Sequence, residues 1–236
     1  MSDILLVHGS CHGAWCWRDL EPALEALGHS ARSIDMPGHG ADPTPVGAVT
    51  LDSCAQAVVD GLRENTVVLA HSWGGFPATR AADLAPGRIA RLIYLCAYAP
   101  WDGYSLANMR RTAPYQPLMH AVLRAPDGQS FTIDPLQTQA VFYHDCPPGT
   151  AEFANMRLCP QAIAPQETPI RLGAGQAGTP KTYIRCMDDR TIPPEFQVTM
   201  TADWPPEDVH EIATGHSPFF ADPQGLARLI DHILKD

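Results

Sequence analysis

The stretch TVVLAHSWGGFPA, Thr66 to Ala78, decides how the rest of this sequence is interpreted. Its first four residues are β-branched or aliphatic, which is typical of a strand buried on both faces. Ser72 follows that run, and Gly74 and Gly75 lead into a segment compatible with a helix. A serine at such a junction, with glycine two positions later, indicates a nucleophile elbow. In that turn the serine is held in a strained backbone conformation with its hydroxyl exposed.

This stretch by itself allows a second interpretation. The usual elbow pattern is Gly-x-Ser-x-Gly, and Ala70 takes the place of the first glycine. Alanine is the next smallest residue, so the turn remains compatible with it. Serine is also a good N-cap, and Ser72 could simply begin a helix. The rest of the chain must therefore supply a base, an acid and an oxyanion hole.

The composition suits one globular domain and argues against nucleic acid and anionic membranes as partners. The chain has 236 residues, and its 16 basic and 26 acidic side chains give a formal charge of −10. This charge argues against nucleic acid or an anionic membrane as a partner, and it disfavours a strongly anionic substrate unless a local pocket differs. No segment resembles a secretory signal or approaches the roughly 18 to 20 apolar residues of a membrane span. The seven scattered cysteines fit a reduced, cytoplasmic protein, and Cys11 and Cys16 lack partners at metal-site spacing. We expect no metal and no cofactor.

Segments with strand and helix character alternate along both ends of the chain. This alternation predicts an α/β fold with a mostly parallel sheet and helices on both faces. The expected strands are residues 3–8, 30–34, 66–69, 91–96, 181–187 and 208–213, and the expected helices are 15–27, 51–64, 75–85, 193–200 and 222–234.

The segment from 97 to 180 breaks this alternation. It contains recurring prolines and no strong strand pattern, which predicts short helices and irregular loops. Long irregular insertions in compact domains are usually functional or disordered. We therefore expect a single domain over residues 1–236, with a cap or lid inserted at about 98–180.

An acid and a base follow two of the late strands. Asp188 and Asp189 come directly after the strand expected at 181–187, and His216 lies in the loop after the last strand. Parallel sheets place their ligands at the carboxyl ends of their strands, where Ser72 also lies. In a serine hydrolase the imidazole takes the proton of the nucleophile and the carboxylate fixes the imidazole tautomer. An isolated loop histidine is more often a surface residue, but this shared placement favours a catalytic His216.

Two backbone N–H groups are candidates for an oxyanion hole. One belongs to Trp73, directly after the nucleophile, and the other to Ser10, in the small-residue loop after the first strand. An ordinary glycine-rich turn would explain the loop equally well. His12 and His71 flank these positions and are expected to shape the site rather than act as bases.

Four segments carry a resemblance to a known family: LVHGSCHGAWCW, AHSWGGFPA, YIRCMDDRTIPPEFQ and TGHSPFFADP. They resemble the α/β-hydrolase family of plant methylesterases and hydroxynitrile lyases, together with its bacterial esterase relatives. The resemblance covers the sheet portion and is weak across the insertion. It implies an α/β-hydrolase fold and places the acid three residues before an Ile-Pro step. That position is Asp189, ahead of Ile192, although Asp188 stays open from the sequence.

The resemblance also separates esterase from lyase at two positions. The lyases carry lysine after the catalytic histidine and threonine after the first-loop histidine, where this chain has Ser217 and Gly9. We therefore expect ester hydrolysis through an acyl-enzyme, with Ser72 as nucleophile. A cyanohydrin lyase, a cofactor-independent dioxygenase that uses the histidine, and a non-catalytic ligand receptor remain open on this fold.

The substrate is expected to be a small, apolar or aromatic carboxylic ester, because few basic residues are available for a charged one. Trp73 is bulkier than the residue common beside this nucleophile and should narrow the acyl pocket. The sequence leaves the natural ester and a homodimer undecided. Residues expected to line the pocket, each equally compatible with ordinary core packing, are His12, Trp73, Tyr98, Trp101, Met119, Leu158 and Phe219.

Overall fold

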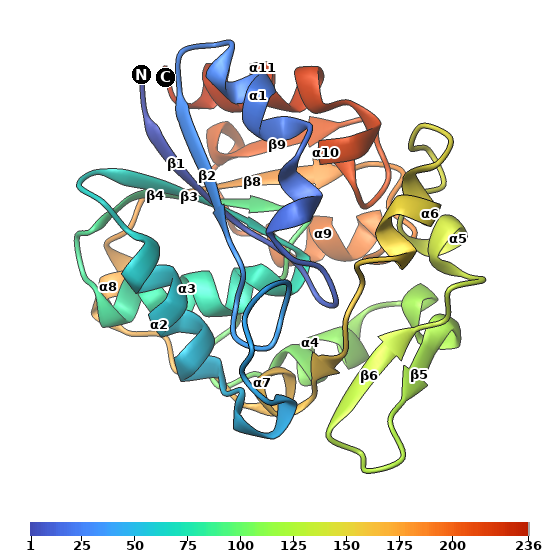
Figure 1. The fold of residues 1–236 in the computed structure, drawn as a ribbon. Helices are drawn as coiled ribbons and strands as arrows, with labels where there is room; N and C mark the ends of the chain where they lie inside the picture. Colours follow the sequence, from blue (N-terminus) through green and yellow to red (C-terminus); the bar gives the residue numbers. More distant parts are fainter. Residues whose placement is uncertain (236) are drawn as a thin grey trace.

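The centre of the molecule is a six-stranded parallel sheet (Figure 1). The computed structural model describes residues 1–235. The strand order β2-β1-β3-β4-β8-β9 places the strand that precedes Ser72 near the middle of the sheet. The predicted α/β class and parallel sheet are confirmed. The strands are β1 (Asp3–Val7), β2 (Ser30–Ile34), β3 (Thr66–His71), β4 (Ile89–Leu95), β8 (Lys181–Cys186) and β9 (Val209–Ile212).

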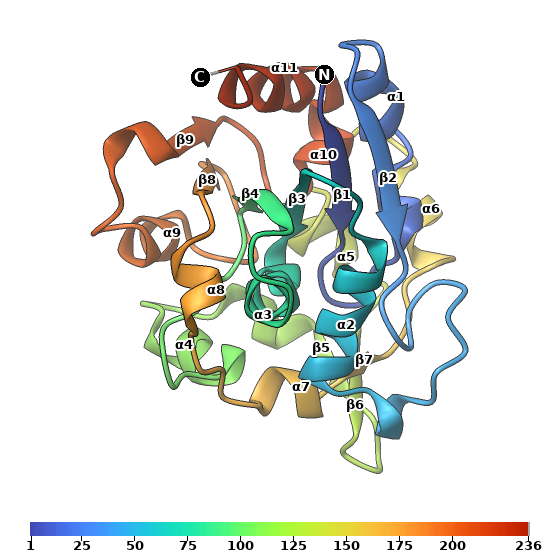
Figure 2. The ribbon, with the colours of Figure 1, turned by 90° about the vertical axis from the view of Figure 1, so that its left-hand side faces the viewer.

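Helices cover both faces of this sheet, as Figure 2 shows in side view. One core lies under α1 (Leu20–Glu25), α10 (Pro218–Ala221) and α11 (Pro223–Ile233). The other lies under α2 (Leu51–Gly61), α3 (Gly75–Leu84) and α9 (Pro194–Met200), and α8 (Ala174–Ala177) packs on the outside against α3. Because both faces are covered, β3 is buried along its whole length and reads as a continuous apolar run.

Local sequence explains where two of these helices begin and end. The Thr50 side chain caps α2 by accepting a hydrogen bond from the Ser53 N–H, and the Ser53 hydroxyl oxygen in turn accepts one from the Thr50 N–H. The single helix predicted over 15–27 is instead a 3-10 turn, Ala14–Trp17, followed by α1. Pro22 explains the break, because proline lacks the N–H that a continuous helix needs and is tolerated only in a first turn.

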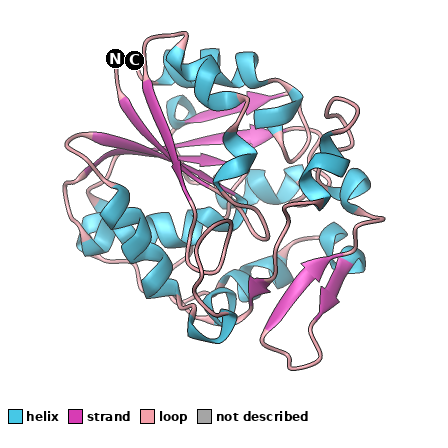
Figure 3. Ribbon diagram, in the orientation of Figure 1, coloured by secondary structure: helices cyan, strands magenta, loops and turns pink. Residues whose placement is uncertain are grey.

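The long insertion between β4 and β8 contains a second, three-stranded antiparallel sheet (Figure 3). The sequence showed no strong strand pattern over 97–180 and did not predict this small sheet. These strands span two to four residues, too short for a period-two pattern to be visible in the sequence. The insertion consists of α4 (Leu106–Thr112), a 3-10 turn (Pro117–Ala121), β5 (Val122–Arg124), β6 (Ser130–Ile133), α5 (Thr138–Val141), α6 (Thr150–Asn155), β7 (Gln161–Ala162), α7 (Ala164–Glu167) and α8.

None of the helices within residues 1–235 is long and apolar enough to cross a membrane.

Candidate active site

A sharp turn between β3 and α3 holds Ser72 on the wall of a cavity. The backbone of Ser72 has a φ of 54°, in the left-handed region that residues other than glycine seldom adopt. A Cβ at Gly74 would lie 2.7 Å from the carbonyl oxygen of His8, and one at Gly75 would overlap the carbonyl oxygen of Tyr98. Both glycines are therefore required for the close crossing of strand and helix that holds Ser72 in a strained conformation.

A buried carboxylate lies behind the ring of His216. The Nδ1 atom of His216 is 2.8 Å from Oδ2 of Asp189, and both side chains are shielded from solvent. The other oxygen, Oδ1, accepts hydrogen bonds from the N–H groups of Thr191 at 2.7 Å and Ile192 at 3.0 Å. Gln197 Nε2 donates to Oδ2 at 3.0 Å. This arrangement directs Nδ1–H of the ring to the carboxylate and leaves Nε2 as the proton acceptor.

The structure separates the two aspartates that the sequence left as alternatives. Asp188 is exposed, whereas Asp189 is only 5% exposed and contacts His216. Successive residues at the end of a strand point in different directions, so only one of the pair faces the histidine.

A hydrogen bond from the last residue of β3, the strand that precedes Ser72, holds the loop that carries His216. His71 Nε2 donates a hydrogen bond to the carbonyl oxygen of His216 at 2.8 Å, and the Cys96 thiol lies 3.5 Å from the same oxygen. Because His71 directly precedes Ser72, the position of the serine and that of the histidine are coupled through one hydrogen bond. The sequence assigned His71 a shaping role, and this contact is of that kind.

His71, Cys96 and His216 also bring three potential metal-ligating atoms within 4.8 Å of one another. The contacts just described already engage His71 Nε2 and His216 Nδ1. Burial raises the pKa of the Cys96 thiol well above its usual range, so this side chain stays protonated, whereas a metal binds the thiolate. These residues therefore fit acid–base chemistry better than metal binding.

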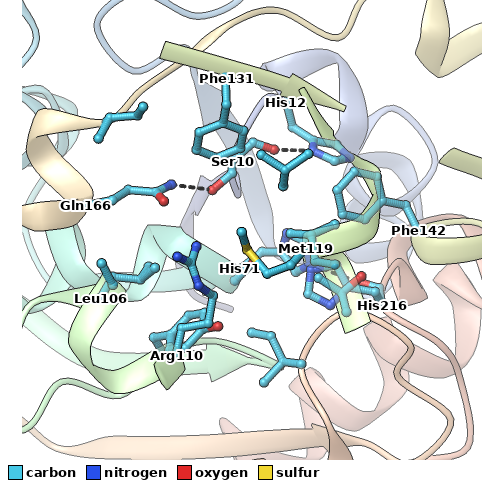
Figure 4. A pocket seen from close by; sticks show the side chains of 18 of the residues that line it. Ser10, His12, His71, Leu106, Arg110, Met119, Phe131, Phe142, Gln166 and His216 are labelled. Atoms are coloured by element: carbon cyan, nitrogen blue, oxygen red, sulfur yellow. Dashed lines mark hydrogen bonds between the residues drawn. The ribbon is translucent and has the colours of Figure 1, made fainter. Parts of the chain in front are cut away.

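The loop after β1 lies directly against Ser72. A Cβ at Gly9 would come within 2.9 Å of the Ser72 Cβ, so the two backbones are nearly in contact. Ser10 is held through its side chain and its backbone. Its Oγ accepts a hydrogen bond from Gln166 Nε2 at 2.8 Å, and its carbonyl accepts one from His12 Nδ1 at 2.7 Å (Figure 4). The segment that contains the Ser10 N–H is thus held rigidly beside Ser72.

His12 supports this loop in its neutral form. Burial lowers the pKa of His12 to about 4. Its Nδ1–H is directed to Ser10, and its Nε2 accepts a hydrogen bond from the Tyr143 hydroxyl at 2.8 Å. With both nitrogens occupied, this ring is unsuited to act as a base.

Three of the seven side chains expected to line a substrate pocket do line the cavity beside Ser72 and His216. They are His12, Tyr98 and Met119. The cavity volume is about 50 Å³, smaller than the sites that hold drug-sized ligands.

The other four expected lining residues lie elsewhere. Trp73 is 1% exposed and packs in the core with its ring stacked on His39, centroids 5.8 Å apart, so it does not narrow the cavity. Phe219 is fully buried beneath the site, Leu158 packs against the same core, and Trp101 packs against the opposite one. Their apolar character reflects core packing, the alternative that the sequence left open for each.

The sequence missed several residues of the cavity wall that come from the insertion. Leu106 and Arg110 lie on α4, Phe131 on β6, and Gln166 on α7, while Phe142 follows α5. Each of these elements is a turn or two of helix or a short strand, so no periodic pattern in the sequence marks which side chain faces the cavity.

Comparison with known proteins gives a consistent picture. The model of a family described as "Alpha/beta hydrolase family" matches residues 4–229. Methylesterase 9 of Arabidopsis thaliana is 31% identical over 100% of this chain and 98% of its own length. Esterase PIR7B of Oryza sativa subsp. japonica is 30% identical, with 96% and 93% of the two chains covered.

Solved structures share the same fold. A pyrethroid hydrolase, PytH, superposes with a TM-score of 0.88 at 24% identity, covering 100% of this chain and 98% of that one. A methylesterase, MES16 from Arabidopsis, gives a TM-score of 0.87 at 21% identity, covering 100% and 99%.

Proposed function

This chain belongs to the alpha/beta hydrolase family, and from that premise we propose that it hydrolyses a small carboxylic ester through an acyl-enzyme on Ser72. One observation carries the proposal: strained Ser72 and His216 line the same cavity, and the far side of the histidine ring is bonded to buried Asp189. The relatives named methylesterase and esterase support an ester as the substrate class.

In the proposed first step, His216 Nε2 takes the proton of the Ser72 hydroxyl while the oxygen attacks the ester carbonyl. The carbonyl π bond opens and places a negative charge on its oxygen, which the N–H groups of Ser10 and Trp73 would stabilise. The C–O bond to the alcohol then breaks, and the imidazolium returns the proton to the leaving alcohol.

In the second step, water attacks the acyl-enzyme. His216 accepts a proton from the water and afterwards returns it to Ser72 as the carboxylic acid leaves. Asp189 stays ionised throughout, because its role is to orient the ring and stabilise the transient imidazolium. The hydrogen bonds that Asp189 accepts from Thr191, Ile192 and Gln197 support this assignment, since they hold the carboxylate in place behind the ring.

The test combines turnover with covalent labelling. We expect hydrolysis of short p-nitrophenyl esters and stoichiometric labelling of Ser72 by a serine-directed fluorophosphonate, located by mass spectrometry of the peptide that contains it. Ser72→Ala should abolish labelling and lower kcat by a factor on the order of 10⁴ or more. His216→Gln should lower kcat comparably.

Two results would count against this function. Ester hydrolysis that persists in the Ser72→Ala variant would exclude Ser72 as the nucleophile and favour a mechanism in which the histidine acts without it. Absence of both labelling and turnover on any short ester would favour a ligand receptor.

A further inference from the structure

An unpaired guanidinium lies in the wall of the same cavity. Arg110 projects from the last turn of α4, and Figure 4 shows its side chain directed from that helix towards the space between Ser10 and Met119. Its Nε is buried and has no hydrogen-bond partner. Among residues 1–235, no carboxylate lies within 4.0 Å of the Arg110 guanidinium, and no side chain or carbonyl accepts a hydrogen bond from it.

The surroundings of Arg110 do not balance its charge. The second arginine of the cavity wall, Arg124, is exposed near the mouth and also forms no ion pair within the described chain. The nearest acid on the wall, Glu167, is exposed and more than 4.0 Å from either arginine. Glu167 raises the pKa of Arg110 and so offsets part of its charge, but this one acid stands against two arginines, so the wall keeps a net positive charge.

A half-buried charged group without a partner is costly, and such groups are normally paired or hydrogen-bonded. Burial lowers the pKa of Arg110, yet an arginine side chain remains charged at any physiological pH. A ligand that pairs with the guanidinium would offset this cost. Apolar side chains lie between the arginine and the base: Met119 stands between Arg110 and His216, and Phe142 stacks on the His216 ring.

We propose that the ester bound here carries a second, anionic group, a carboxylate, which Arg110 binds while Ser72 faces the ester carbonyl. This substrate class rests on the ester hydrolysis proposed above. The planar guanidinium fork matches a carboxylate in bidentate geometry, and an apolar stretch separates the two ends. This proposal departs from the mainly apolar or aromatic ester expected from the sequence, because the chain is acidic as a whole but its cavity wall is not.

Two pairs of substrates, each differing only in one end group, test this on the unmodified enzyme. The first compares monomethyl adipate with methyl hexanoate, which places the carboxylate in the acyl part. The second compares 4-acetoxybutanoate with butyl acetate, which places it in the alcohol part. We expect kcat/KM for the anionic ester to exceed that of its neutral partner by about 10- to 100-fold in one pair, the size of a hydrogen bond to a charged group. The preferred pair tells which part of the ester lies against Arg110.

Variants of two neighbouring arginines then locate the effect. Arg110→Met should abolish the preference by raising KM for the anionic ester, so that kcat/KM becomes similar for the two members of the preferred pair. The matched control is Arg111→Met: Arg111 is on the same helix but is exposed, bonded to Asn108, and absent from the cavity wall. It should keep the preference. Thermal unfolding of both variants checks that the fold is intact.

Two outcomes would overturn the proposal while leaving ester hydrolysis standing. One is an enzyme that cleaves both neutral esters as fast as their anionic partners. The other is a preference that persists in Arg110→Met. Failure of the proposed function itself looks different, since then no ester is cleaved and Ser72 is not labelled.

Discussion

The Nδ1 atom of His216 lies 2.8 Å from Oδ2 of Asp189, whereas the adjacent Asp188 is exposed to solvent. Two chemically identical neighbours therefore occupy opposite environments, one hydrogen-bonded on both oxygens and one solvated. The pair offers a direct comparison, because the same substitution can be made at each position.

Asp189→Asn should lower kcat by about 10³- to 10⁴-fold, because an amide in this place favours the wrong imidazole tautomer and cannot stabilise the imidazolium. Asp188→Asn should change kcat by less than about twofold. Steady-state hydrolysis of a p-nitrophenyl ester measures both. Equal decreases of kcat in the two variants would contradict the proposed role of Asp189.

Gln197 is predicted to position Asp189. Its Nε2 donates to Asp189 Oδ2 at 3.0 Å and to the Ile192 carbonyl at 2.9 Å, and its Oε1 accepts from the Cys186 N–H at 3.0 Å. Gln197→Leu should lower the free energy of unfolding by about 2 to 3 kcal/mol, because it leaves buried polar groups unpaired. Urea denaturation measures this, with the exposed Gln56→Leu as a control expected to cost less than about 1 kcal/mol.

A second variant separates positioning from stability. Gln197→Glu brings another carboxylate beside Asp189 and the His216 ring. We expect the acidic limb of the pH profile of kcat/KM to move to higher pH, because added negative charge favours the protonated imidazole. A purely structural role for Gln197 would leave that limb in place.

Gly9→Ala should impair catalysis more than folding. The added methyl would lie 2.9 Å from the Ser72 Cβ and 2.8 Å from His71 Nδ1, closer than ordinary contacts allow. We expect kcat to fall at least tenfold, with a decrease in Tm of a few degrees. Gly28→Ala is unsuitable as a control because of its φ of 88°, so Gly178→Ala, whose added methyl would be no closer than 3.6 Å to another atom, serves instead. A Gly9→Ala enzyme of normal activity would contradict the close packing of this loop on the nucleophile.

Stability should fall in mild acid because His12 is held neutral. Its pKa is lowered to about 4 in the folded protein by burial, against 6.5 for an ordinary histidine. The unfolded chain therefore binds more protons between these values, so stability is full above about pH 6.5 and is lost as the pH falls towards 4.

His12 alone should account for a loss of about 2 kcal/mol between pH 7.5 and pH 5. Buried His8 and His71, whose pKa values are also lowered by burial, act in the same direction. Urea unfolding at the two pH values measures the total loss. In His12→Gln that loss should shrink by about 2 kcal/mol, and an unchanged loss would exclude His12 as a contributor.

The sequence alone determined the α/β fold and the order of its elements. A strand buried on both faces needs a continuous apolar run, and a sharp strand–helix turn needs small residues. The local sequence is therefore enough to predict β3 and the turn at Ser72. The same local logic located His216 and the pair Asp188 and Asp189 after late strands, because parallel strands bring their carboxyl ends to one edge, and the fold then placed Asp189 against His216. These signals depend only on neighbouring residues.

Tertiary structure alone decided what the cavity wall contains. Trp73 and Phe219 are apolar and near the site in sequence, yet both pack into the core. Arg110 and Gln166 come from short elements of the insertion and reach the cavity only because the chain folds back over the sheet. Which side of a short helix faces inward depends on contacts with residues far away in the chain, and no local pattern encodes those contacts.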